Sequence, residues 1–327
     1  MICSAKMVRQ VTVAAIQKSM GWNKDENVAS AEKLVRDAAA KGANIILLSE
    51  LFEGVYWCQE QSGRFFDWAA PASPSHPLLA RFSKLAAELG VVLPISFFER
   101  ANNSYYNTVA VMDADGTCLG LYRKSHIPDG VGYEEKFYFT PGDTGFRVWN
   151  TKFGKIGIAI CWDQWFVECA RCMALLGAEL IFYPTAIGSE PSDGDLDSRD
   201  HWQRVMQGHA AANLTPVIAS NRVGVERLPP SPALPAGSQI TFYGSSFITD
   251  EHGAKVVEAN RVETCVITHT FDLDAVNETR RPWGIFRDRR PDLYGPIATM
   301  DGRTHQGVPL GTNVAPSVPL FRLEDVK

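Results

Sequence analysis

The chain has 327 residues, of which 45% are hydrophobic and 21% charged, and this composition is typical of a globular protein with a large buried core. The formal net charge of -5 argues against a general nucleic-acid-binding surface, so nucleic acid is not an expected partner. No apolar run reaches the roughly 18 to 20 residues that a membrane span requires, so we expect no membrane partner. Seven scattered cysteines favour reduced thiols over a disulfide framework and predict a cytoplasmic location.

Segments with strand-like and helix-like patterns alternate along the chain. Apolar alternation or continuous apolar runs predict strands at 11–17, 44–50, 91–99, 155–161, 179–186, 215–224 and 264–272. Helical spacing predicts helices at 25–42, 77–89, 165–176 and 200–212. Two hairpins are expected, one turning at Asp115-Gly116 within 107–124 and one within 245–258. Helices between strands, with some hairpins, indicate a mixed sheet inside an α/β layered domain.

No internal linker interrupts this pattern, so residues 1–327 are predicted to form a single domain. The Pro-rich patch at 228–237 indicates a surface loop between strands. The last segment, 282–327, has little periodicity and many Arg and Pro residues. Two interpretations of it stay open: a C-terminal arm that packs at a subunit interface, or an irregular coat over its own domain.

Three reactive side chains follow predicted strands: Glu50, Lys124 and Cys161. Open α/β sheets place functional groups just beyond the carboxyl ends of their strands. A carboxylate at the end of the apolar run 45–48 is expected to be buried, and burial is costly unless a cation is nearby. Lys124 can supply that cation.

The three residues form a sufficient set for acyl transfer without histidine. A free thiol has a pKa of roughly 8.5, and a nearby ammonium favours its thiolate while a carboxylate can take the proton. Lysine and the backbone N–H after the nucleophile can stabilise the charge that grows on the attacked group. Each residue alone is more often an ordinary core or surface residue, so the function depends on the set and its flanking sequences.

Those flanks carry a family resemblance. The stretches LLSELFEG, YRKSHIPDG and CWDQWFVECAR, in this order, resemble the three signature stretches of the nitrilase superfamily of carbon–nitrogen hydrolases. TPGDTGF, YPTAIG and NRVG extend the likeness over nearly the whole chain. The resemblance implies an αββα sandwich, a homo-oligomer of two or more chains, and a catalytic set of Glu50 as base, Lys124 as oxyanion stabiliser and Cys161 as nucleophile. It also implies a second glutamate near the lysine, which matches Glu135 best, with Glu134 as the alternative.

No metal or other cofactor is expected. Cys169 and Cys172 form a C-x-x-C without the second pair that zinc requires, so we interpret them as packing residues. His126 lies two residues after Lys124, but the resemblance gives the base role to a glutamate, which leaves His126 a structural role. GxSxG, GxGxxG after a strand and GxxxxGK[ST] are all absent from the sequence, which removes the main support for lipase-like, Rossmann and P-loop functions.

The substrate is predicted from one loop, YPTAIGSEP, at residues 183–191. Glu190 is positioned to meet a cationic substrate tail, although a loop glutamate is more often simply solvated. The loop and the stretch 124–146 resemble superfamily members that hydrolyse a small cationic ureido compound. Asp129 is expected to add negative charge, and Trp162 and Tyr56 to line the aliphatic part. A hydrolase of a β-ureido acid or a dicarboxylic monoamide would need Arg or Lys in place of Glu190, and a non-catalytic scaffold would not need the catalytic set.

Overall fold

The computed structural model describes residues 8–232, 234 and 236–300. The chain divides into two compact units, 1–281 and 282–327. The described part of the smaller unit contains two short 3₁₀ helices, η4 (Pro291–Leu293) and η5 (Gly295–Ala298). Most of the predicted arm, residues 301–327, lies outside the described residues. Its role at a subunit interface therefore stays a prediction.

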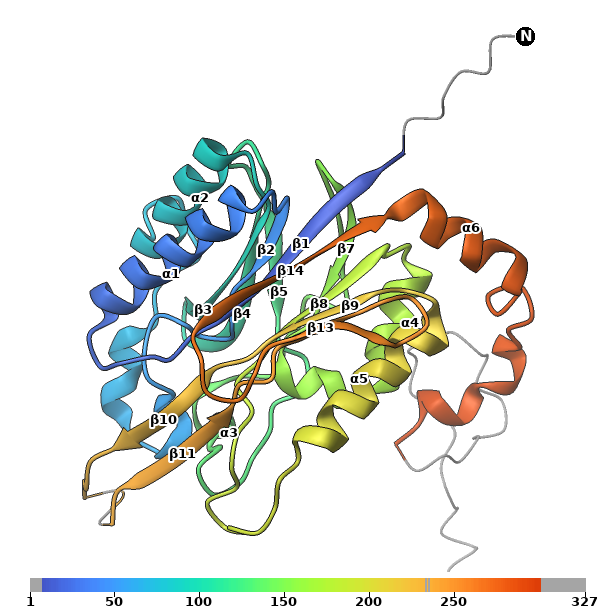
Figure 1. Cartoon of the computed structure of the whole chain (residues 1–327). Coiled ribbons are helices and arrows are strands. Elements are labelled where there is room, and N and C mark those ends of the chain that lie inside the picture. Colours follow the sequence, from blue (N-terminus) through green and yellow to red (C-terminus); the bar gives the residue numbers. More distant parts are fainter. Residues whose placement is uncertain (1–7, 233, 235, 301–327) are drawn as a thin grey trace, which may run out of the picture. The chain divides into compact units, whose positions relative to one another are not determined.

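The larger unit is built in four layers, helix, sheet, sheet and helix (Figure 1). Helices α1 (Lys24–Ala40) and α2 (Pro77–Leu89) cover the outer face of one sheet. Helices α4 (Val167–Leu175) and α5 (Arg199–Asn213) lie on the other side of the unit. This arrangement confirms the predicted αββα sandwich. Helix α6 (Leu273–Trp283) follows the last strand.

The first sheet has two three-stranded parts, which are joined where β2 (Ile45–Leu47) lies beside the start of β3 (Leu93–Ala101). Its strands are β14 (Cys265–Asp272), β1 (Gln10–Gln17) and β2, then β3, β4 (Ser104–Met112) and β5 (Cys118–Arg123). The Ile46 N–H donates to Val92 O at 3.0 Å, and the Val92 N–H donates to Asn44 O at 2.8 Å. These bonds align β2 with the start of β3, so the residues after β2 and after β5 belong to one layer.

The second sheet has the order β13-β12-β9-β8-β7-β6. Its strands are β13 (Lys255–Glu258), β12 (Phe247–Thr249), β9 (Val217–Ser220), β8 (Leu180–Pro184), β7 (Gly154–Ile158) and β6 (Val148–Thr151). β7, β8 and β9 run parallel, so their carboxyl ends meet at one edge. A separate hairpin of β10 (Val223–Leu228) and β11 (Ser238–Tyr243) flanks the Pro-rich loop, as predicted.

Strand β1 is buried on both faces, which explains its nearly continuous apolar sequence. Val13 and Ala15 belong to the core between the two sheets, whereas Ala14 and Ile16 belong to the core under α1 and α2. Two separate apolar cores therefore hold the layers together.

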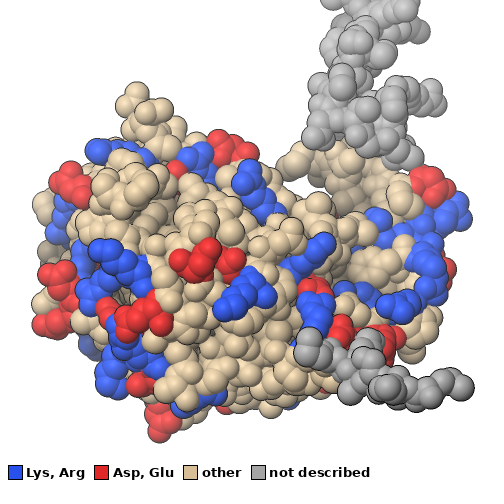
Figure 2. Space-filling model, turned by 90° about the horizontal axis from the view of Figure 1, so that it is seen from above, with Lys and Arg blue, Asp and Glu red and all other residues tan. Residues whose placement is uncertain are grey.

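Surface charge and the apolar character of the helices are the two features that concern the predicted partners. Over much of the face in Figure 2, acidic and basic side chains of the described residues are interspersed. Within the residues that the structure describes, no helix is both long enough and apolar enough to span a bilayer.

The observed elements differ from the predicted ones mainly where strands approach the site. The strand predicted at 44–50 ends at Leu47, and the strand predicted at 155–161 ends at Ile158. In both places the chain leaves the sheet before the reactive residue. A left-handed residue then follows: Leu51, directly after Glu50, has a φ of 49°, and Cys161 itself has a φ of 43°. Strands β6 and β11, all of β10 beyond Gly224, and helix α6 were not predicted.

Candidate active site

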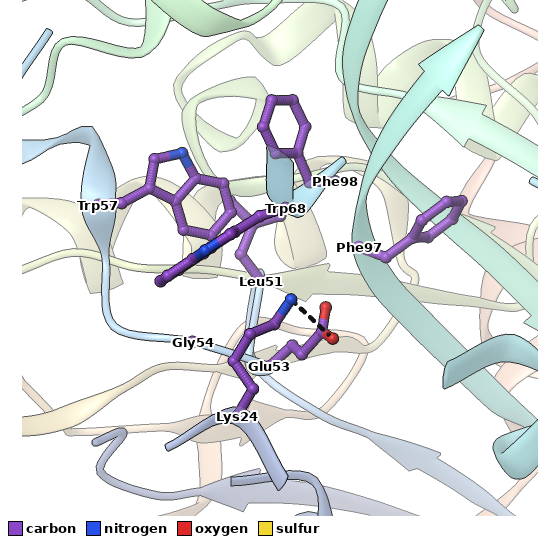
Figure 3. A pocket seen from close by; sticks show the side chains of 8 residues that line it. All are labelled: Lys24, Leu51, Glu53, Gly54, Trp57, Trp68, Phe97 and Phe98. Carbon is purple, nitrogen blue, oxygen red and sulfur yellow. Dashed lines mark ion pairs between the residues drawn. The ribbon is translucent and has the colours of Figure 1, made fainter. Parts of the chain in front are cut away.

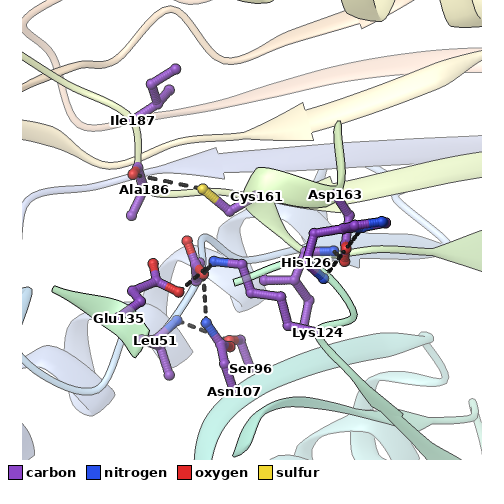
Figure 4. A network of polar contacts seen from close by, with 12 residues as sticks. Leu51, Ser96, Asn107, Lys124, His126, Glu135, Cys161, Asp163, Ala186 and Ile187 are labelled. Carbon is purple, nitrogen blue, oxygen red and sulfur yellow. Dashed lines mark hydrogen bonds and ion pairs between the residues drawn. The ribbon is translucent and has the colours of Figure 1, made fainter. Parts of the chain in front are cut away.

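Four buried side chains come together near the strand ends, and Lys124, Glu135 and Cys161 among them are labelled in Figure 4. Glu50 lies three residues after β2, and Lys124 follows β5 directly. Glu135 begins the short helix α3 (Glu135–Tyr138), and Cys161 begins the 3₁₀ helix η3 (Cys161–Trp165). The structure thus brings together the catalytic set predicted from separate stretches of sequence.

Lys124 lies between two carboxylates. Its Nζ is 2.9 Å from Glu50 Oε1 and 2.6 Å from Glu135 Oε2, and its side chain is fully buried. Burial works to lower the pKa of Lys124, but the charges of Glu135 and Glu50 outweigh it and raise that pKa well above its usual value. The lysine therefore remains a cation at neutral pH. Of the two predicted alternatives, Glu135 pairs with it, whereas Glu134 accepts a hydrogen bond from Gln61.

Other polar groups hold the two carboxylates in place. Tyr56 Oη donates to Glu135 Oε1 at 2.7 Å, and Asn107 Nδ2 donates to Glu50 Oε1 at 2.6 Å. Burial raises the pKa of Glu135, against the opposing effect of Lys124. The hydrogen bonds from Tyr56 and Asn107 orient the two carboxylates and fix their rotamers.

Glu50 Oε2 is buried and has no hydrogen-bond partner among the described residues. Glu50 Oε1 already accepts from Lys124 and Asn107, so one oxygen is held and the other is unoccupied. An unsatisfied buried carboxylate oxygen is costly, and a catalytic role is one reason for such an oxygen to be retained. This oxygen is suited to take the proton of a thiol.

Cys161 supplies that thiol. Its φ of 43° lies in the left-handed region, an uncommon conformation for a residue with a side chain and one that marks functional sites. Its Sγ lies 3.8 Å from Ala186 O. Burial raises the pKa of Cys161, the negative charge of Glu50 raises it further, and Lys124 opposes them without prevailing. Lys124 thus favours the thiolate, as expected, but it does not outweigh burial and Glu50, so a base has to take the thiol proton as attack begins.

Asp163 holds the turn that presents Cys161. Its carboxylate accepts from Ile160 N at 2.9 Å, from His126 N at 2.9 Å and from Tyr122 Oη at 2.7 Å, and it lies 2.7 Å from His126 Nδ1. The His126 ring stacks on Phe166 with ring centroids 3.6 Å apart. His126 therefore contacts the turn and not the reacting groups. Sequence reasoning missed Asp163, although its place in CWDQ was a signal.

Arg222 holds the loop that carries Glu50 and was also missed. Its guanidinium donates to Glu50 O at 3.1 Å, to Leu51 O at 2.7 Å and to Gly54 O at 3.0 Å. It is fully buried and pairs with Glu226 at 2.9 Å. The Leu51 N–H donates to Ser96 Oγ at 2.9 Å, which fixes the same turn from the other side. The signal was the NRVG stretch, which matched the family without a stated role.

A cavity of about 400 Å³ opens onto the catalytic residues. Cys161 and Glu135 line it, and so do three of the predicted substrate-binding residues, Asp129, Trp162 and Glu190. Tyr56 is not among its lining residues, because the ring is fully buried and its hydroxyl is bound to Glu135. Tyr56 therefore contacts the catalytic set and not the cavity.

The cavity carries an excess of carboxylates. Its lining includes Asp129, Glu135, Glu190 and Asp197, and among the described lining residues there is no Lys or Arg. Two of these carboxylates are paired from outside the lining, Glu135 with Lys124 and Asp197 with Arg261. Burial, and then the charge of Asp193, raises the pKa of Glu190. Both effects favour a cation next to Glu190, since an ammonium would relieve the cost of its charged form.

A second hollow lies behind the Glu50 loop, between Lys24, Glu53 and the aromatic rings of Trp57 and Trp68 (Figure 3). Lys24 Nζ pairs with Glu53 at 3.0 Å and lies 5.1 Å from the centre of the Trp68 ring. The hollow has a volume of about 10 Å³, which is enough for one water molecule at most. This hollow is part of the packing of the loop.

A strained buried thiol, an unoccupied carboxylate oxygen and a buried ammonium at the end of a cavity define a thiol hydrolase of the α/β sandwich class. Residues 12–281 match the family model of carbon–nitrogen hydrolases, and the chain belongs to this family, within the nitrilase superfamily. It is 60% identical to an N-carbamoylputrescine amidase of Arabidopsis thaliana, covering 90% of this chain and 97% of that protein.

Two further proteins are similar to this chain over most of its length. A citrullinase of Francisella tularensis is 52% identical over 88% of this chain and 98% of its own length. The crystal structure of a carbon–nitrogen hydrolase from Helicobacter pylori G27 superposes with a TM-score of 0.82 at 40% identity, covering 89% of this chain and 99% of that one.

Proposed function

We propose that the protein hydrolyses N-carbamoylputrescine to putrescine, carbon dioxide and ammonia, a step of polyamine biosynthesis. The observation that carries this proposal is the cavity, which has Cys161 and Glu135 among its lining residues, bears four carboxylates and has no Lys or Arg among its described lining residues. Such a cavity favours a ureido compound with a cationic tail and disfavours acidic ones. The 60% identity to an N-carbamoylputrescine amidase supports the same substrate.

The proposed reaction uses each buried group once. As Cys161 Sγ attacks the carbamoyl carbon, Glu50 takes the thiol proton, because its Oε2 is unoccupied. The cation of Lys124 offsets the negative charge that grows on the carbamoyl oxygen. Glu50 then passes the proton to the departing nitrogen and activates the water that cleaves the thiol adduct. The carbamic acid released by this water breaks down to carbon dioxide and the second nitrogen product, so one water is consumed for each set of putrescine, carbon dioxide and ammonia.

A second candidate substrate is citrulline, because a citrullinase is 52% identical to this chain. Citrulline carries the same ureido group, but it also carries an α-carboxylate that requires a cationic partner. Asp129 and Glu190 would repel that carboxylate, whereas Asp197 pairs with Arg261, and among the described lining residues His201 is the one basic side chain. The cavity therefore supports the purely cationic tail better.

The test is ammonia release by the purified protein on a panel of compounds that differ in charge. We expect kcat/KM to be highest for N-carbamoylputrescine, lower for uncharged N-pentylurea, and lowest for β-ureidopropionate and for a monoamide of a dicarboxylic acid. A preference for the acidic compounds would contradict the proposal.

We also propose that the enzyme is a cytoplasmic homo-oligomer. The exposed apolar side chains of Val167, Leu175 and Leu176 on and beside α4 support an interface between chains. Free thiols at Cys58, Cys118 and Cys265 support a reducing compartment. Light scattering tests the assembly, and a mass near the 36.1 kDa of one chain at assay concentration would contradict it.

A further inference from the structure

Tyr133 lies on the wall of the cavity, and neither its position nor its contacts are explained by the catalytic steps. Burial, and then the charge of Glu190, raises the pKa of Tyr133 well above its usual value, and Cys161 adds to the shift. Glu190 and Cys161 are thus both close enough to Tyr133 to affect its pKa, and its hydroxyl remains protonated. Its ring also lies 5.7 Å from the ring of Tyr56, which holds Glu135.

The hydroxyl of Tyr133 is bound to the backbone of the loop that carries Glu190. It accepts from the Gly188 N–H at 3.1 Å and donates to Ser189 O at 3.2 Å. A single hydroxyl therefore satisfies two consecutive residues directly before Glu190. Loops held by such paired bonds have fewer accessible backbone conformations than solvated loops.

The opposite side of the same loop is held by β11. The Ser189 N–H donates to Thr241 O at 2.9 Å, and the Thr241 N–H donates to Ser189 Oγ at 3.0 Å. A side chain at Gly188 would place its Cβ 2.6 Å from Thr241 O, so the loop approaches the strand as closely as glycine allows. Tyr133 thus closes the second side of a loop that is already fixed on the first.

A close backbone approach reinforces this contact. Gly132 has a φ of 82°, and a Cβ there would lie 2.5 Å from Pro191 Cγ. Gly132 precedes Tyr133 and Pro191 follows Glu190, so the two loops are packed together on either side of the hydroxyl contact. We refer to Gly132, Tyr133, Gly188, Ser189 and Pro191 together as the loop clamp.

We propose that Tyr133 is a positioning residue that, through the loop clamp, fixes the distance between Glu190 and Cys161 and thereby selects substrates by the length of their cationic tail. This inference rests on the proposed function, because it assumes that Glu190 binds the ammonium group. With a fixed loop, a tail one methylene shorter or longer places its ammonium group away from the carboxylate whenever its ureido group is at Cys161. With a mobile loop, Glu190 can follow the ammonium group, and the discrimination weakens.

The test uses Tyr133→Phe, which removes the hydroxyl and keeps the ring. Three substrates are compared: N-carbamoylputrescine, its homologue with one additional methylene, and uncharged N-pentylurea. We expect KM for N-carbamoylputrescine to rise at least fivefold with kcat within twofold of wild type, and KM for N-pentylurea to change less than twofold. The ratio of kcat/KM between N-carbamoylputrescine and the longer homologue should fall at least threefold.

A general structural role predicts a different result. Equal losses on the charged and uncharged compounds, or an unchanged length ratio, would overturn the positioning role. Tyr105→Phe is the matched control, since the Tyr105 ring packs on Phe66, 4.7 Å away, and Tyr105 is not among the residues that line the cavity. We expect that variant to leave all three values of kcat/KM within twofold of wild type.

Glu190→Gln separates this inference from the proposed function. If that variant loses activity equally on charged and uncharged compounds, the proposed ammonium site is wrong, and the positioning role is wrong with it. If it loses activity only on the charged compounds while Tyr133→Phe shows no such bias, the positioning role alone is wrong. If both roles hold, the double variant should lose little more activity on N-carbamoylputrescine than Glu190→Gln alone. Both residues would then act through the same contact, the one between Glu190 and the ammonium group.

Gly132→Ala provides a second, independent perturbation of the loop clamp. The added Cβ must displace Pro191, so we expect the same selective rise in KM for N-carbamoylputrescine as in Tyr133→Phe. Thermal denaturation of each variant establishes that it is folded. A folded Gly132→Ala protein with wild-type KM and wild-type length discrimination would overturn the clamp.

Discussion

Cys161 is a buried thiol with a raised pKa, held in a left-handed turn. Cys161→Ala removes the nucleophile while replacing one small side chain with another, so turnover should be abolished and the melting temperature should change by only a few degrees. Cys118→Ala is the matched control, because Cys118 is exposed and does not line the cavity. Ammonia release near the wild-type rate from purified Cys161→Ala would show that another group attacks the substrate.

Lys124 has both a catalytic and a structural role. Lys124→Met keeps the aliphatic stem and removes the charge, so we expect kcat to fall on the order of a hundredfold or more. Because Glu50 and Glu135 would then be buried without their cation, the free energy of unfolding should also fall by about 3–5 kcal/mol. Denaturant unfolding measures the second effect.

An exposed lysine provides the control for that variant. Lys33 pairs with Asp37 on the surface of α1, and Lys33→Met should cost about 0.5 kcal/mol or less. A Lys124→Met protein as stable and as active as the Lys33→Met protein would contradict both roles of Lys124.

Glu190 should produce a pH dependence that only charged substrates show. Its pKa is raised by burial and by Asp193, so on acidification it loses its charge at a higher pH than the roughly 4.3 of an ordinary glutamate. The value of kcat/KM reports groups of the free enzyme, so for N-carbamoylputrescine it should fall on the acid side more steeply than for N-pentylurea. In Glu190→Gln the two acid limbs should coincide. Parallel pH profiles in the wild-type enzyme would contradict an ionised Glu190 in binding.

At the scale of elements, the turn between β7 and α4 determines where the thiol lies. The Asp163 carboxylate accepts from Ile160 N, His126 N and Tyr122 Oη, which ties β7, β5 and the loop after Lys124 to one side chain. Asp163→Asn keeps the shape but weakens charge-assisted bonds, each worth about 1.5–3 kcal/mol. We expect kcat to fall at least tenfold with little change in KM, because the cavity remains and the thiol moves. A selective rise in KM would place Asp163 in binding instead.

The sequence predicted most elements well, because burial on one or both faces leaves a clear periodicity. Helix α2 matches its predicted range, owing to Pro77 at its first position and Gly90 in the left-handed conformation at its end. Strand ends near the site were predicted too long, since the apolar run continues for one or more residues after the chain has left the sheet. β6 and β11 are partly exposed and carry no long apolar run, so they lack a comparable signal.

At the scale of the whole molecule, the catalytic set was predictable and its supports were not. Glu50, Lys124 and Cys161 lie within contiguous stretches that resemble a family. Arg222 binds the carbonyl of Glu50 from 172 residues away, and the NRVG stretch that contains it does not indicate that contact. The bonds of Tyr133 to the Glu190 loop depend likewise on how two distant loops pack.

The comparison of N-carbamoylputrescine with L-citrulline under identical conditions tests the central claim most directly. The two compounds share the reacting ureido group, so they differ at the end of the molecule that meets the acidic part of the cavity. A cavity whose lining includes Asp129 and Glu190 should repel the additional carboxylate of citrulline. We predict that wild-type kcat/KM is at least tenfold higher for N-carbamoylputrescine, equivalent to about 1.4 kcal/mol. Equal values, or a preference for citrulline, would contradict the account.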